Sequence, residues 1–446
     1  MTEPRRSWRL RALAVLAALE LTAGVTGAVV LHEDAALPGL ASDRARSVPD
    51  DDPEAVRTAA VERLLGDRAQ AIRRRDRAAF VATLDPDPSA APFRKRQAKV
   101  FDALADVPIG SWSYALDPTR ERVPDARVDA LRGPGWWAPD VVLRYQLKGY
   151  DPSPTRAEQY FTFVQRAGRW LVASDDDFKA VGQASTPGIW DGGDVVVVRG
   201  ARCLVLGHPA SARTLRQVAD AVDAAVPRVT AVFGSDWTRK VVVLVPDSSA
   251  ELAELLDSRS DFSQIAAVAT AELESSADYK PIGDRVIVNP PNFTKLGSLG
   301  RRVVLTHEVA HVATRKASGP LMPTWLVEGF ADYVGYQGVD LPLSVSAREL
   351  RAAVRAGRVP KALPTDRDFD ATNKELSEVY EQAWLAVLRL AEVHGRAKLL
   401  AFYRDVGAAR EGDRDAIVEA AFRKAFGRST ADFVEDWTAT LRLRLR

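Results

Sequence analysis

The chain has 446 residues, of which 46% are hydrophobic, and this is enough to bury the cores of roughly three domains, so the composition excludes a mainly disordered protein. Lysine and arginine number 61 against 60 aspartate and glutamate residues, a balance that argues against nucleic acid as the partner. The single cysteine excludes an intrachain disulfide and a cysteine-only metal cluster, so a metal site would have to use histidine and carboxylate side chains.

The N-terminus is predicted to cross a membrane. Several arginines precede a stretch from Ala12 to Leu31 in which Glu20 is the one charged residue, and about 20 apolar residues are what a membrane-spanning helix requires. We expect residues 1–34 to form a basic cytoplasmic start and a single-pass anchor in the cell membrane, followed by a linker at 35–52 and an extracytoplasmic remainder. A signal peptide cleaved near Ala28, giving a secreted protein, is the alternative.

Residues 53–180 are predicted to form an α+β domain. Apolar residues recur every three to four positions, which predicts helix as far as about Ala105, with a break at the Asp-Pro repeat of residues 85–88. Strands are then expected at Val141–Leu147, Glu158–Val164 and Arg169–Val172. This order resembles the nuclear-transport-factor-2-like cone fold. No acid–base group of residues stands out here, so a non-catalytic role is favoured.

Residues 195–446 are predicted to form a second domain with a small sheet and a mostly helical C-terminal part, which makes the fold class of the whole chain α+β. Beyond Leu296 the sequence is typical of helices almost to its end. Strands are expected at Val195–Val198, Cys203–Leu206, Lys240–Val245 and Arg285–Asn289, and helices at Ala210–Val232 and Ser249–Leu256.

An apolar helical run from Val303 to Val312 contains the pattern His-Glu-x-x-His. A helix places His307 and His311 on one face, one turn and about 40° apart, so both imidazoles can reach one metal ion. Two core histidines bonded to backbone groups are the alternative interpretation. The pattern therefore predicts a metal site, with Glu308 beside it on the same helix.

A third ligand is expected downstream, because a catalytic zinc takes three protein ligands and keeps one position open. After a break at residues 318–320, a second helix carries Glu328 and Asp332 four positions apart on one face. An otherwise apolar helix would not leave two carboxylates without partners. We interpret Glu328 as the third ligand and Asp332 as the residue that orients a ligand imidazole, with a solvated helix edge as the alternative.

Together, His-Glu-x-x-His and the later Trp-Leu-x-Glu-Gly-x-Ala-Asp resemble the gluzincin metallopeptidases, the thermolysin-like clan, and most closely the bacterial peptidase-MA-like proteins. The resemblance covers about residues 195–443. It implies Zn2+ held by His307, His311 and Glu328, with Glu308 as the general base and Asp332 orienting His307. The chain lacks the Gly-x-Met-Glu-Asn exopeptidase motif, and its spacing from His311 to Glu328 is shorter than in aminopeptidases of this clan, so an endopeptidase is favoured.

The expected reaction is hydrolysis of a peptide bond. Zinc lowers the pKa of a water ligand toward about 7, and Glu308 is expected to take the proton and later deliver it to the leaving amine. Tyr380 is the candidate donor to the oxyanion, because related enzymes place a Tyr or His downstream of the third ligand; a buried structural tyrosine is the alternative. By analogy with the clan, the strand Arg285–Asn289 is expected to be an edge strand that pairs with extended substrate.

The expected partners are thus a peptide or protein substrate and, through the N-terminal helix, a membrane. Two other functions stay open. The site could serve a non-catalytic binding module that keeps the metal for structure, although such a module has no need of Glu308. Alternatively, the protein could be a zinc hydrolase that acts on a non-peptide amide. The sequence does not determine the cleavage specificity or the oligomeric state.

Overall fold

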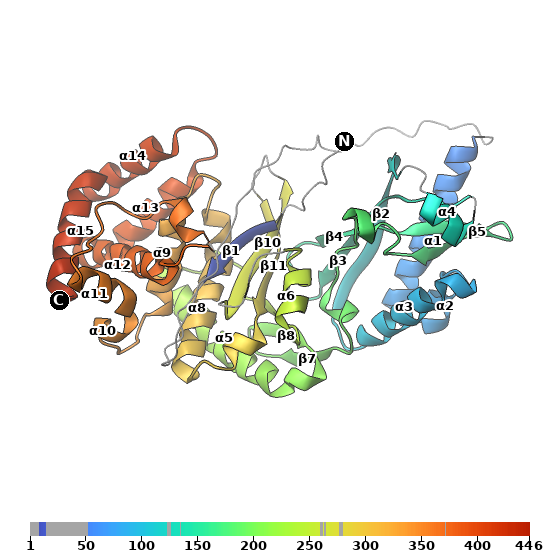
Figure 1. Cartoon of the computed structure of the whole chain (residues 1–446), viewed down its shortest axis with the longest axis horizontal. Coiled ribbons are helices and arrows are strands. Elements are labelled where there is room, and N and C mark those ends of the chain that lie inside the picture. Colours follow the sequence, from blue (N-terminus) through green and yellow to red (C-terminus); the bar gives the residue numbers. More distant parts are fainter. Residues whose placement is uncertain are drawn as a thin grey trace. The chain divides into compact units, whose positions relative to one another are not determined.

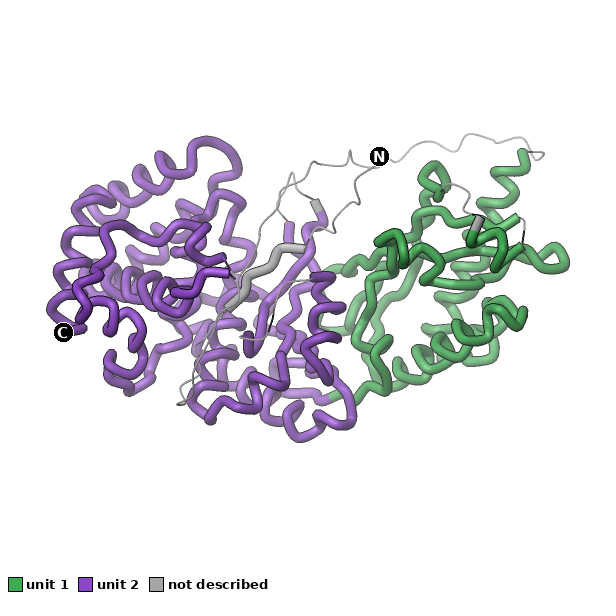
Figure 2. The backbone as a smooth tube through the Cα atoms, in the orientation of Figure 1, with its two compact units in different colours: residues 1–8, 34–197 green, residues 9–33, 198–446 purple. Residues whose placement is uncertain are grey.

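The computed structural model describes residues 9–14, 52–122, 126–133, 135–258, 262, 265–275, 280–370 and 372–446. These residues form two compact units (Figures 1 and 2). The first unit comprises the described residues from 52 to 197. The second comprises those from 198 to 446, together with the short strand β1 (Arg9–Ala14).

The predicted membrane segment lies mostly outside the described residues. Ala12 to Ala14 belong to strand β1, whereas residues 15–31 are not described. Among the helices that the structure does describe, none combines the length and the apolar character that crossing a bilayer requires.

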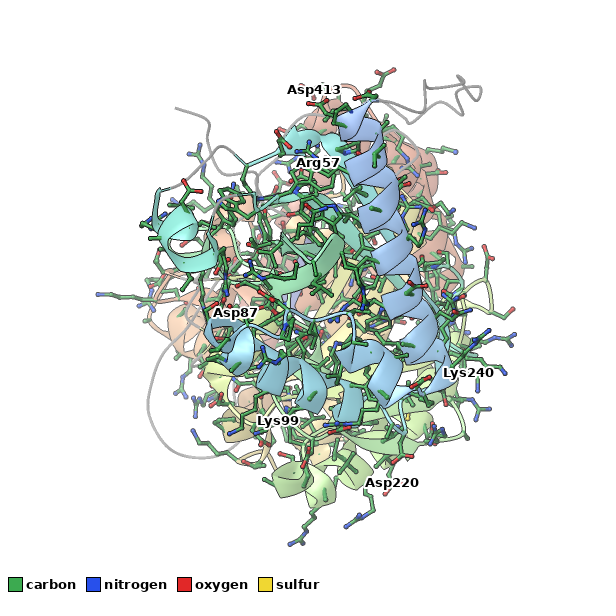
Figure 3. The ribbon with its side chains drawn as sticks, turned by 90° about the vertical axis from the view of Figure 1, so that its right-hand side faces the viewer. Arg57, Asp87, Lys99, Asp220, Lys240 and Asp413 are labelled. Atoms are coloured by element: carbon green, nitrogen blue, oxygen red, sulfur yellow. The ribbon has the colours of Figure 1, made fainter. Side chains whose placement is uncertain are left out.

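The first unit begins with helices, as the periodicity predicts. Helix α1 starts at Pro53 because the side chain of Asp52 accepts a hydrogen bond from the backbone N–H of Glu54, and it ends at Arg75, which adopts a left-handed conformation. Figure 3 views the unit from the side on which α1 and α3 lie, with Arg57 on α1 and Lys99 on α3 labelled. The helices are α1 (Pro53–Arg74), α2 (Arg77–Val81), α3 (Ala91–Ala103) and α4 (Ala126–Arg132).

Two small antiparallel sheets complete this unit. Strands β2 (Ile109–Glu121), β3 (Pro139–Leu147) and β4 (Thr155–Gln159) form one, and β5 (Thr162–Arg166) and β6 (Arg169–Ser174) form the other. The single strand predicted at Glu158–Val164 is therefore wrong. The chain leaves the β3 partner after Gln159, and the backbone N–H of Tyr160 bonds to the Ser185 hydroxyl instead.

A shared aromatic core holds the helices and sheets of the first unit together. Trp137 and Phe163, which form an isolated backbone bridge, lie in this core with Leu64 and Leu65 of α1 and Phe93 of α3. The predicted likeness of this unit to the nuclear-transport-factor-2-like fold stays a prediction.

The second unit is built on a six-stranded sheet in the order β1-β10-β11-β9-β8-β7. Strands β8, β9 and β11 run parallel, and β10 runs antiparallel to β11. Strand β11 thus has a partner on each side, so the prediction that this segment is an edge strand is wrong. The strands are β7 (Val196–Arg199), β8 (Cys203–Gly207), β9 (Val241–Val245), β10 (Ala267–Ser275) and β11 (Lys280–Val288).

Helices pack against this sheet and continue beyond it. Helix α5 contacts β8, α8 contacts β10 and β11, and α5 and α8 contact each other. Helix α9 lies between α8 and α12, which brings the predicted ligand helices into the interior. The helices are α5 (Ala212–Phe233), α6 (Ser249–Leu255), α7 (Pro290–Phe293), α8 (Ser298–Thr314), α9 (Thr324–Gly335), α10 (Leu343–Ser346), α11 (Arg348–Arg355), α12 (Leu376–His394), α13 (Arg396–Ala408), α14 (Arg414–Phe426) and α15 (Thr430–Arg444).

Candidate metal centre

Helix α8 carries His307, Glu308 and His311 into the interior of the second unit. Every residue from Val303 to Thr314 is buried, because the helix is covered by the sheet, by α5 and by α9. The two histidines lie one helical turn apart, and their Nε2 atoms face each other at 2.9 Å. Both imidazoles therefore converge on one point, as the four-residue spacing predicts.

Helix α9 brings Glu328 to the same point. Its Oε2 atom lies 3.3 Å from Nε2 of His307 and 3.4 Å from Nε2 of His311. One ligand atom from each of the three residues lies within 4.8 Å of the others, and all three side chains are buried. Neighbouring residues on α9, Trp325 and Leu326, are buried as well, so packing of the apolar face fixes the direction in which Glu328 points.

Asp332, one turn further along α9, contacts the far side of His307. Its Oδ1 atom lies 2.7 Å from Nδ1 of His307, and both groups are buried. A carboxylate at Nδ1 keeps the proton on that nitrogen, and, although burial opposes it, Asp332 and Glu328 raise the pKa of His307 well above its ordinary value, so a metal ion would take the place of a proton at Nε2. This contact is compatible with the orienting role predicted for Asp332, which stays a prediction.

The cluster gathers acidic groups that a cation would stabilise. Glu308, Glu328 and Asp332 are three buried carboxyl groups beside two imidazoles. The backbone of Ala269 hydrogen-bonds to Glu308, and Oε2 of Glu328 contacts the Nε2 atoms of the two histidines. Buried carboxylates are costly to ionise, and a divalent ion at the point of convergence would stabilise them.

The donor atoms fit zinc in type and in spacing. Two histidines and one glutamate form a ligand set of catalytic zinc sites. Ligand atoms about 2.0–2.1 Å from a tetrahedral ion lie about 3.4 Å from one another. The three separations of 2.9, 3.3 and 3.4 Å are close to that value, so the side chains need little rearrangement to hold the ion.

The pKa shifts of two of these groups favour the forms that bind metal. Burial lowers the pKa of His311 to about 4, so this imidazole is neutral at physiological pH. Burial alone would raise the pKa of Glu328, but the nearby histidines outweigh it and lower the value to about 2. A neutral imidazole and an ionised carboxylate are the states that a metal ion needs.

Glu308 lies beside the point of convergence, between α8 and strand β10. Burial raises the pKa of this carboxyl to about 8, and the backbone N–H of Ala269 in β10 and the charge of His307 oppose the increase. A carboxyl whose pKa is raised toward neutrality is suited to taking up and releasing a proton. The position of Glu308 is thus compatible with the role of a base.

Two charged residues near the cluster were not singled out by the sequence. Arg315, four residues after His311, is buried, and its Nε donates to Oδ1 of Asp284 in β11 at 3.1 Å. Its charge lowers the pKa values of Glu308 and His311. Because Arg315 finds its partner on a distant strand, no local pattern in the sequence marks this pair.

Tyr380, the predicted oxyanion donor, is buried on α12. Its ring packs edge-on against Phe369, with the ring centroids 5.2 Å apart. The structure does not test the catalytic role of Tyr380, which stays a prediction. The other described histidines lie apart from the cluster: His208 pairs with Glu251 at 2.7 Å, and the ring of His394 lies against that of Phe426, with the ring centroids 4.7 Å apart.

Comparison with known proteins gives little beyond this geometry. No family model and no curated sequence matches the chain. Solved structures that align with it include an M1 zinc metallopeptidase from Deinococcus radiodurans, at 13% identity and a TM-score of 0.30, over 63% of this chain and 60% of that one. Another is yeast LTA4 hydrolase, at 12% identity and a TM-score of 0.34, over 67% of this chain and 49% of that one.

The chain thus spans less than two thirds of the length of either structure. At TM-scores this low the likenesses carry no argument about function, which has to be drawn from the site itself.

Proposed function

We propose that this protein is a zinc-dependent peptidase of the gluzincin type, acting as an endopeptidase on a peptide or protein substrate. The convergence of His307, His311 and Glu328 on one buried point is the observation that carries the proposal. A purely structural zinc site needs four protein ligands and no base. Here three ligands would leave one position of the ion open, and Glu308, which follows the ligand His307 on the same helix, is buried beside the cluster.

Glu308 and Asp332 have different roles in the proposed hydrolysis. Zinc, when bound, lowers the pKa of a water ligand and polarises the substrate carbonyl. Glu308 accepts the proton of the attacking water on its carboxylate and delivers it to the leaving amine. Asp332 keeps the Nδ1 proton of His307 in place throughout, so that Nε2 stays available to the metal.

Strand β10 is the part of the sheet suited to bind an extended substrate. The backbone of Ala269 in β10 hydrogen-bonds to Glu308. Strand β10 pairs with β11 on one side and with the short strand β1 on the other, so an extended peptide would have to take the place of β1. Pairing there would bring the scissile bond next to Glu308.

Metal analysis and a cleavage assay test the proposal together. The purified chain is expected to contain about one zinc per molecule and to cleave members of a broad peptide library, with both properties lost in His311→Ala. Mass spectrometry measures the metal and the products. Absence of zinc after zinc-replete expression would exclude the metal site. Zinc without cleavage of any peptide would favour the binding module, or, if an amide of another class is hydrolysed, the non-peptide hydrolase.

The location of the protein is proposed from the sequence alone. The arginine-rich start and the apolar stretch to Leu31 support a single-pass membrane protein with the residues after Asp52 outside the cytoplasm. In that arrangement Arg9–Ala14 would not pair with β10, so the proposal and strand β1 exclude each other. A topology reporter fused after Asp52 tests this. Activity there of a reporter that works only in the cytoplasm would contradict it, and N-terminal sequencing of the native protein would reveal cleavage near Ala28.

A further inference from the structure

The segment that joins the two ligand helices is short and has little structure of its own. After α8 the chain makes one 3₁₀ turn, η5 (Arg315–Ala317), and passes through residues 318–323 before α9 begins. His311 and Glu328 lie on opposite sides of this connector. Their relative position therefore depends on what holds the connector, because a metal site requires its ligands within a few tenths of an ångström.

One side chain of the C-terminal helices, Tyr403 of α13, contacts this connector. Its hydroxyl oxygen lies 2.8 Å from Oγ of Ser318, and Ser318 in turn donates its proton to the carbonyl of Thr314 at 3.1 Å. Either hydroxyl can be the donor in the bond between Tyr403 and Ser318, and the hydroxyl of Tyr403 also interacts with Thr314. Thr314 is the last residue of α8, so the chain of bonds reaches the helix that carries His311.

The same tyrosine contacts the helix of the third ligand. Its ring packs against that of Phe330, two residues after Glu328, with the ring centroids 4.6 Å apart. Tyr403 is completely buried. One side chain thus touches the end of α8 through its hydroxyl and α9 through its ring.

Backbone contacts one turn further along α13 reinforce this arrangement. A Cβ atom at Gly407 would lie 1.7 Å from the carbonyl oxygen of Ala317, and one at Gly319 would lie 2.4 Å from the carbonyl oxygen of Gly407. Only glycine fits at these positions. The connector therefore lies directly on the backbone of α13, and the hydroxyl of Tyr403 has little freedom to find another partner.

We propose that Tyr403 is a positioning residue of the zinc site, which sets the distance of Glu328 from His307 and His311 through Ser318 and Phe330. The inference rests on the proposed zinc peptidase function and adds the C-terminal helices to it. Tyr403 acts on the metal only through the connector and α9. Its loss should change how tightly zinc binds without removing a ligand.

The test is the zinc dissociation constant of the full chain, measured by competition with a chelator. Tyr403→Phe removes only the hydroxyl and keeps the ring against Phe330, so the fold should be retained. Zinc should bind about tenfold more weakly, as is usual when a group that supports a metal ligand is lost. Ser318→Ala should weaken zinc binding at least as much, because it also removes the bond from Ser318 to Thr314, and the double variant should be no worse than Ser318→Ala alone.

Thr438→Val is the matched control. It also removes a buried hydroxyl, one that donates to a carbonyl within α15. Zinc affinity should stay at the wild-type value.

The outcomes distinguish this inference from the proposed function. If wild type binds no zinc, the proposed function fails. If wild type binds zinc, and Tyr403→Phe lowers the melting temperature of the zinc-free protein but binds zinc as tightly as wild type, the tyrosine is merely structural and the inference is wrong. Additive effects of Tyr403→Phe and Ser318→Ala would also overturn it.

Discussion

Substitution of Glu308 by glutamine is expected to reduce peptide cleavage by roughly 10²–10⁴-fold or more while leaving zinc content and folding nearly unchanged. Glutamine has the shape of glutamate but cannot accept the proton of the attacking water. Glu308 is not one of the three converging ligands, so its loss removes no bond to the metal. The backbone N–H of Ala269, which bonds to Glu308, can also donate to the side-chain oxygen of glutamine, so the substitution keeps this bond.

The comparison variant is Asp332→Asn, which should lose zinc affinity but keep the ability to cleave peptides once zinc is bound. Asp332 contacts His307 rather than the open position, so its substitution should weaken zinc binding by one to two orders of magnitude. Cleavage should then recover when zinc is supplied in excess. No such recovery is expected for Glu308→Gln.

Cleavage rates and bound zinc, measured in parallel on both variants, decide the matter. If Glu308→Gln cleaves as fast as wild type, Glu308 is not the base and the proposed mechanism is wrong. Loss of zinc from Glu308→Gln would show instead that Glu308 supports the metal.

The metal-binding cluster could be predicted because its geometry is local. The positions of His307 and His311 follow from the pitch of a single helix, and those of Glu328 and Asp332 follow from another. That these two helices contribute to one site is predicted from chemistry, because the carboxylates of Glu328 and Asp332 on an apolar helix need partners. The structure brings these four residues together, with Asp332 against His307 as predicted.

Strand order could not be predicted in the same way. The segment Arg285–Val288 has the composition of a buried strand, but which strands pair with it depends on contacts between distant parts of the chain. Strand β10 pairs with β11, although the segment that forms β11 is predicted to be an edge strand. Similarly, an aromatic residue in a helix, such as Tyr403, is typical of a core position, and no spacing in the sequence reveals that its hydroxyl reaches Ser318.

The glycine of the Trp-Leu-x-Glu-Gly segment is explained only by the structure. Gly329 lies inside α9, where glycine is less favourable than alanine by about 1 kcal/mol. A Cβ atom there would lie 2.4 Å from the carbonyl oxygen of Ala383 in α12, whereas real Cβ contacts below 3.0 Å are essentially never seen. Gly329 therefore allows α9 and α12 to pack backbone to backbone, immediately after Glu328.

Gly329→Ala is accordingly expected to destabilise the second unit and to weaken zinc binding together. The helices must separate by about 0.6 Å, from 2.4 Å to at least 3.0 Å, and a backbone carbonyl cannot rotate away as a side chain can. Overpacking of this kind costs about 1–3 kcal/mol, more than the gain in helix propensity. The shift also exceeds the roughly 0.2 Å tolerance of metal ligand distances, so Glu328 should lose its position.

Thermal unfolding with and without zinc, combined with zinc affinity, measures both effects. The matched control is Gly66→Ala in α1, also inside a helix, where no atom lies within 4 Å of the added Cβ. This control should stabilise the first unit by about 0.5–1 kcal/mol and leave zinc affinity unchanged. If Gly329→Ala behaves like Gly66→Ala, the close contact between α9 and α12 does not limit the position of Glu328, and the explanation of this glycine is wrong.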